Sequence, residues 1–157
     1  PISVNWRVVL VPSLLVLAAG TGLAADAAFP EAAWRKVEIE PTWTSIYVGT
    51  VSLRMPEFTR NATGEYESTY SARVLPWVFQ NETGRIGIRV TDDALRRLAR
   101  GETVDFEGRA VNRDGEERAV TGRAAPSDAA SGRIKVRVRV SPRIELVFNT
   151  TYRFTGG

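Results

Sequence analysis

The 157-residue chain contains neither cysteine nor histidine. Without cysteine it can form no disulfide, thiolate nucleophile or iron–sulfur cluster. Without histidine it lacks a Ser-His-Asp triad, an ordinary zinc site and any side chain that titrates near neutral pH when unperturbed. Carboxylate, lysine and tyrosine chemistry are left, so catalysis is restricted. We therefore expect neither an enzyme nor a cofactor.

Lysine is scarce as well, because Lys36 and Lys135 are the only two and arginine supplies the other cations. The net charge is only +3, which is too small to require a nucleic-acid partner. The hydrophobic share of 43% and the charged share of 25% are ordinary globular values. Together with the length they predict a single domain.

Residues 1–27 have the pattern of a bacterial secretory signal peptide. Arg7 provides a short positive region, and Val8–Ala19 is an apolar run. Small residues that permit cleavage follow it, with cleavage expected after Ala24 or Ala27. This pattern predicts a protein that is exported to the periplasm or the extracellular space.

The apolar run is too short for a spanning helix, which needs about 20 apolar residues, and Pro12 interrupts it. We expect a membrane contact only if this segment stays uncleaved. Residues 28–157 are then left to form one antiparallel β-domain.

The segment 133–154 carries the clearest β-pattern. Its first half alternates strictly between cations, at Arg133, Lys135, Arg137 and Arg139, and apolar residues, at Ile134, Val136, Val138 and Val140. Neighbouring side chains of a strand point to opposite faces, so this alternation predicts one charged and one apolar face. After Pro142 apolar residues again occupy even positions, namely 144, 146, 148, 152 and 154. Either a three-residue turn over 141–143 or one long bent strand would preserve this parity.

Three further segments are rich in β-branched and aromatic residues and are predicted to be strands: Trp43–Leu53, Tyr66–Leu75 and Arg85–Val90. Residues 103–111 and 116–124 flank a turn sequence and predict a hairpin. A three-residue loop, in which Asn112 faces Glu116, keeps the apolar faces together and places Gly115 at a left-handed position.

One short helix is predicted at about 92–100. Thr91 or Asp92 can cap it, and Gly101 can end it. Because short connections favour antiparallel order, the chain is predicted to be mainly β: an antiparallel β-sandwich or partly closed β-barrel of about seven strands. The signal-peptide helix would precede this domain.

The cationic face of the segment 133–139 is the candidate ligand site, formed by Arg133, Lys135, Arg137 and Arg139. Alternate side chains of a strand lie roughly 7 Å apart, a spacing that suits phosphate or sulfate groups. The alternative is a solvated outer face, since any strand over a core is polar on one side. If the face binds a ligand, we expect an anionic envelope component.

Two other binding modes are open. The aromatic residues could stack on a sugar or could fill the core; they are Trp43, Tyr47, Tyr66, Tyr70 and Trp77. A barrel of this size could also enclose a small apolar ligand. Several acidic residues are close together in the sequence, but none of these pairs marks a cleft of the kind that a glycosidase needs. A small envelope hydrolase is therefore the weakest alternative.

The C-terminal Tyr152-Arg-Phe154 resembles the aromatic end of an outer-membrane barrel. The chain departs from that pattern because three residues follow, and because Arg85–Val90 is shorter than the roughly nine residues a crossing strand needs. We therefore expect an exported, soluble, non-enzymatic β-domain with a binding or structural role in the bacterial cell envelope. Its expected partner is an anionic component or another envelope protein, and a small outer-membrane barrel is the alternative.

Overall fold

The computed structural model describes residues 31–156. The predicted signal peptide, residues 1–27, lies outside the described residues. No helix within the described part combines the length and the apolar character that a membrane crossing needs.

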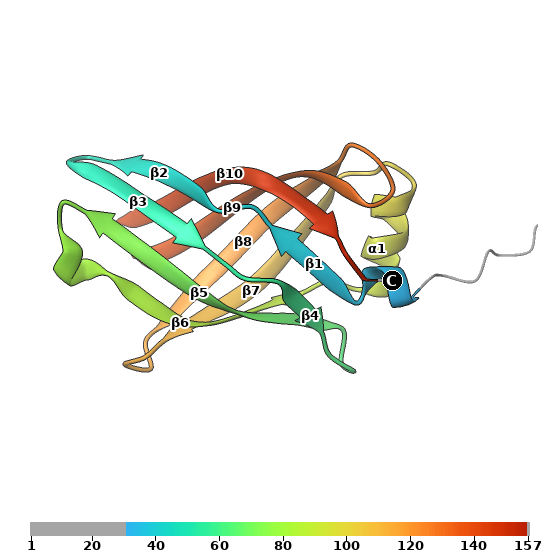
Figure 1. The fold of residues 1–157 in the computed structure, drawn as a ribbon, viewed down its shortest axis with the longest axis horizontal. Helices are drawn as coiled ribbons and strands as arrows, with labels where there is room; N and C mark the ends of the chain where they lie inside the picture. The colour runs from blue at the N-terminus through green and yellow to red at the C-terminus, as the bar shows by residue number, and fades with distance from the viewer. Residues whose placement is uncertain (1–30, 157) are drawn as a thin grey trace, which may run out of the picture.

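The described chain forms a closed antiparallel barrel of eight strands (Figure 1). The ring runs through β1 (Lys36–Ile39), β4 (Phe58–Arg60), β5 (Glu65–Leu75), β6 (Glu82–Arg89), β7 (Val104–Asn112), β8 (Glu117–Pro126), β9 (Ser131–Ser141) and β10 (Ile144–Phe154). Pairing of β1 with β10 closes it, with Val37 opposite Phe154. The predicted mainly β, antiparallel fold is thus confirmed, and of the two predicted architectures the structure has the barrel.

The segment Trp43–Leu53 is not one strand, as predicted, but a hairpin of β2 (Thr42–Ile46) and β3 (Gly49–Arg54). The chain reverses at Tyr47 and Val48, and Gly49 follows with a φ of 125°. A side chain on Gly49 would collide with the carbonyl oxygen of Leu75 on the adjacent strand. Glycine tolerates this backbone conformation and this close approach, which allows the tight turn.

The segment after Pro56, for which the sequence predicts no strand, also contributes to the barrel. It contains β4, whose Phe58 is fully buried. A strand of three residues is too short to show a periodicity in the sequence.

The hairpin of β7 and β8 has the predicted register. Val104 faces Ala124, Phe106 faces Gly122, and the Asn112 N–H donates to the Glu116 carbonyl at 3.0 Å. Gly115 has a φ of 81°, the left-handed conformation expected for it. The requirement that apolar faces stay together therefore selected the correct loop length.

The β9–β10 connection keeps the apolar residues of both strands on the same face, but it is neither a three-residue turn nor one long bent strand. Ser141 pairs directly with Ile144 around Pro142 and Arg143, and a β-bulge then shifts the register so that Arg139 faces Glu145. One extra residue on one strand restores the alignment of the two apolar faces. Val138 consequently lies opposite Leu146, and Val136 opposite Phe148.

The barrel interior is filled with apolar side chains. Five of them are less than 2% exposed: Phe58, Phe148, Leu95, Val120 and Val136. The helix α1 (Asp92–Ala99) lies at one end of the barrel, near the short 3-10 helix η1 (Glu31–Trp34) and the C-terminus (Figure 1). Its Leu95 and Leu98 are buried, so α1 covers the core at that end. A second short 3-10 helix, η2 (Val78–Gln80), connects β5 to β6 at the other end.

Candidate functional site

The predicted cationic face lies on the outer wall of the barrel. Arg133, Lys135, Arg137 and Arg139 are all exposed on β9, while Ile134 and Val136 are buried beneath them. A shallow groove of about 700 Å³ runs over β7 to β10 and includes the first three cations. Arg139 lies outside the lining of this groove.

The four cations differ in their partners. Glu145 on β10 holds Arg137 at 3.0 Å and Arg139 at 3.6 Å. Arg133 and Lys135 form no ion pair with any residue in the range 31–156. These two side chains are therefore the cations of β9 that remain available to an anion.

The groove also contains two acidic side chains, Asp105 and Glu107. Arg123 binds Asp105 through two hydrogen bonds, of 2.6 and 3.1 Å, and these hold the pKa of that carboxyl below its usual value. The lining carries four cations and two carboxylates, and one pair of these, Arg123 and Asp105, neutralise each other. Thr121 and Asn149 add uncharged polar groups suited to sugar hydroxyls.

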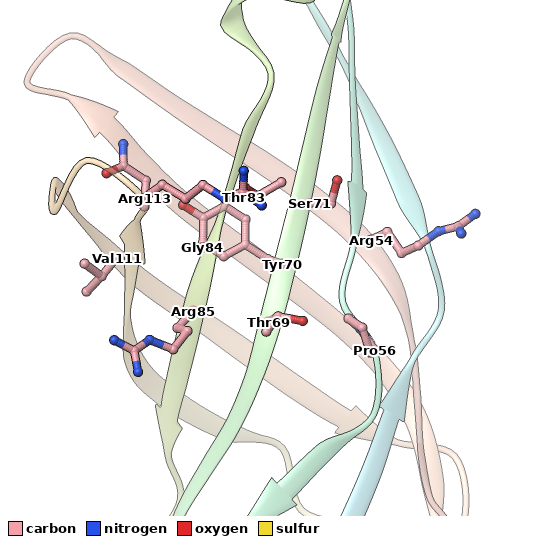
Figure 2. A pocket seen from close by; sticks show the side chains of 11 residues that line it. Arg54, Pro56, Thr69, Tyr70, Ser71, Thr83, Gly84, Arg85, Val111 and Arg113 are labelled. Carbon is pink, nitrogen blue, oxygen red and sulfur yellow. The ribbon is translucent and has the colours of Figure 1, made fainter.

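A second groove, of about 610 Å³, lies on the outer faces of β3, β5, β6 and β7 (Figure 2). It contains Arg54, Arg85 and Arg113, together with the hydroxyl groups of Thr69, Ser71 and Thr83. Figure 2 shows Arg54 and Arg85 on opposite sides, pointing away from each other. The guanidinium groups do not converge as a site for one small anion would require.

A polar network faces the barrel interior, and no pattern in the sequence predicts it. The Tyr70 hydroxyl donates to Glu82, and Arg118 donates to the same carboxylate at 3.1 Å. Asn112 donates to Glu116 at 3.0 Å and accepts from the Glu116 N–H at 2.8 Å. These residues come from four neighbouring strands, β5 to β8, and from the β7–β8 turn, so the pairing of these strands brings them together.

The pKa shifts in this network reflect burial and hydrogen bonds between its own members. Burial, followed by the hydrogen bond to Glu82, raises the pKa of Tyr70. Burial opposes the charge of Arg118, but its hydrogen bonds to Glu116 and Glu82 outweigh that effect and raise the pKa of Arg118. Because each of these groups already has a partner, the network supports the interior of the barrel rather than offering free groups to a ligand.

Large exposed apolar side chains gather at the end of the barrel opposite α1. We call this set the apolar rim; it consists of Trp43, Tyr47, Val48, Leu75, Trp77, Val78, Phe79 and Ile144. The structure therefore divides the aromatic residues considered above into two sets. Tyr66 and Tyr70 fill the core, whereas Trp43, Tyr47 and Trp77 belong to the rim.

Two acidic side chains that a catalytic role would need are engaged by arginines. Asp92 binds Arg60 at 2.6 Å at the start of α1, and Asp105 binds Arg123. Within residues 31–156, no three acidic side chains come together in a way that could hold a metal ion. Comparisons with family models, with curated proteins and with solved structures found no match for this chain.

Proposed function

We propose that this chain is an exported, non-enzymatic binding domain of the bacterial cell envelope, which holds an anionic polysaccharide or lipopolysaccharide on its outer wall. The observation that carries the proposal is the pair Arg133 and Lys135. They share one face of β9, line the groove of about 700 Å³ and lack an acidic partner among the described residues. Charge-assisted hydrogen bonds from such groups to phosphate or sulfate are roughly twice as strong as neutral ones.

The position of β9 favours binding. The strand is paired along its length with β8 on one side and β10 on the other. Its backbone is therefore held in place before any ligand arrives, and the cations keep a spacing of roughly 7 Å. A pre-organised row of cations loses less conformational entropy on binding than a flexible basic loop would.

The polarity of the barrel wall supports a barrel in water over the alternative of an outer-membrane barrel. The outward positions of β9 are cationic, and those of β7 include Asp105, Glu107 and Arg109. The inward positions of both strands are apolar except for Asn112 at the end of β7. A membrane barrel presents an apolar band to lipid and a polar interior. The pattern of β7 and β9 is the reverse.

The test is retention on immobilised heparin and on lipopolysaccharide, comparing wild type with Arg133→Glu/Lys135→Glu. Each lost contact to a charged group is worth about 1.5–3 kcal/mol, so we expect the affinity to fall at least about tenfold and elution to occur at lower salt. Arg137 and Arg139 make poorer test sites, because their replacement would also leave Glu145 without its partners.

The matched control is Arg35→Glu/Arg153→Glu, which makes the same change of net charge at exposed cations outside the groove. We expect this variant to keep most of its retention. Equal losses in the two variants would show that retention follows the net charge, and would refute a site on β9.

A further inference from the structure

The apolar rim has a defined place in the fold. The β2–β3 hairpin contributes Trp43, Tyr47 and Val48, and Ile144 is the first residue of β10. Leu75 ends β5, and the β5–β6 connection, which includes η2, contributes the other three residues. Figure 1 shows the β2–β3 turn and η2 at the same end of the barrel, away from α1 and η1. The rim thus lies toward one end of the barrel, and none of its residues lines the basic groove on the wall.

The rim is held in an outward conformation. The Trp77 indole N–H donates to the Val48 carbonyl at 3.2 Å, which ties the β5–β6 connection to the β2–β3 turn. The Trp77 and Phe79 rings meet edge to face, with centroids 5.9 Å apart. The Asn81 side chain accepts from the Val74 N–H at 2.8 Å and fastens the end of this connection to β5. These contacts keep apolar side chains in water when nothing covers them, which is unfavourable.

The shape of the rim favours a partner whose surface needs no preformed hollow. Tyr47 is fully exposed and Phe79 is 76% exposed, so both project from the tips of connections. Projecting side chains need a matched hollow on a protein partner, but they can enter the interfacial layer of a bilayer without one. Tryptophan and tyrosine favour that layer, because one end of each ring system is apolar and the other is polar.

The charges beside the rim complement an anionic surface. Arg73 precedes Leu75 on β5, and Arg143 precedes Ile144; both are exposed, and neither forms an ion pair within residues 31–156. The turn between β7 and β8 adds Arg113, Asp114 and Glu116, and Glu116 forms an ion pair with Arg118 at 2.6 Å. Anionic headgroups attract cations near the membrane surface.

We propose that the apolar rim docks onto the interface of a membrane that contains anionic lipid, with the barrel axis pointing away from the bilayer and α1 farthest from it. The chain binds peripherally, through side chains at the tips of its connections, while the charged wall of the barrel stays in water. This contact is independent of the proposed polysaccharide site, so either proposal can fail without the other.

The absence of native cysteine allows a direct test with the full chain. Val78→Cys and Ala99→Cys each create one labelling site, the first on η2 in the rim and the second on the exposed side of α1. Each is labelled with an environment-sensitive fluorophore and mixed with vesicles of phosphatidylcholine and phosphatidylglycerol. We expect a severalfold rise in emission at position 78, quenched by nitroxide-labelled lipid, and no change at position 99. The N-terminal segment is present in both samples, so its own affinity for lipid cannot produce this difference.

Unchanged emission from the label at position 78 on addition of vesicles, or a larger rise in emission at position 99, would overturn the proposal. So would a response at position 78 that rises with protein concentration in the absence of vesicles, because it would identify a second copy of the chain as the partner.

The contribution of the two cations to membrane docking is tested with Arg73→Ala/Arg143→Ala, which carries the label at position 78. At about 1 kcal/mol for each cation near an anionic surface, we expect the lipid concentration needed for half-maximal emission to rise roughly tenfold or more. Arg35→Ala/Arg153→Ala, with cations outside the rim, should leave it unchanged. Equal shifts in the two variants would contradict docking through the rim, and a thermal melt of each variant shows that it is folded.

Discussion

Among the single residues, Tyr152 illustrates how the barrel interior alters a side chain. It is buried on β10, where its ring lies against Gly132 on β9 and meets the Phe154 ring edge to face, 5.7 Å between centroids. Burial, and secondly the negative charge of Asp128, raise the pKa of Tyr152 to about 12. The ionised phenolate is therefore disfavoured in the folded chain.

This pKa predicts a loss of stability in alkali. In the unfolded chain the phenol ionises near pH 10, whereas in the folded chain it keeps its proton up to about pH 12. Between these values unfolding releases a proton, so the free energy of unfolding falls as pH rises. We expect Tyr152→Phe to reduce this slope by up to about 1.4 kcal/mol per pH unit. Urea titrations at several pH values measure it, and identical slopes in the two proteins would contradict the assignment.

At the scale of elements, α1 depends on a single side-chain cap. The Thr91 hydroxyl accepts from the Ala94 N–H at 3.1 Å, and Asp92 and Asp93 occupy the first turn, where negative charge is favourable. A helix of this length is not stable alone and depends on Leu95 and Leu98 packing on the barrel end.

We predict that Thr91→Ala lowers the free energy of unfolding by about 1 kcal/mol, because it removes one acceptor from the first turn. Thr91→Ser keeps the hydroxyl and should lose much less. The measurement is guanidinium denaturation of both variants. Equal losses would indicate that the methyl group of Thr91, and not its cap, matters.

For the whole molecule, closure of the ring means that no strand of the barrel can leave without breaking the pairing on both of its sides. Probes at different places should therefore report one cooperative transition. We expect the fluorescence of Trp34, in a chain whose other three tryptophans are replaced by phenylalanine, to give the same denaturant midpoint as the far-ultraviolet circular dichroism of that chain. A separate, earlier transition of Trp34 would show that the end covered by α1 unfolds independently.

Much of the fold was predictable from local patterns. The alternation over 133–140, the register of the β7–β8 hairpin and the limits of α1 depend on residues that are close in the sequence. The β2–β3 hairpin was missed because Tyr47 and Val48 are not typical turn residues, and the signal for the turn was a single glycine. The cations of β9 were identified correctly as an exposed row, but their partner Glu145 was not, because the β-bulge sets which residues face each other.

The sequence by itself determined which side of each long strand faces the core, since side chains alternate with a period of two and burial separates apolar from charged residues. Only the tertiary structure decided that the sheet closes, because Val37 and Phe154 are far apart along the chain and no local pattern encodes their pairing. It also decided that the Tyr70–Glu82–Arg118 network meets inside the barrel and that the apolar rim gathers outside one end. Both sets come from separate strands and connections, so strand pairing assembles them and no single segment of the sequence contains them.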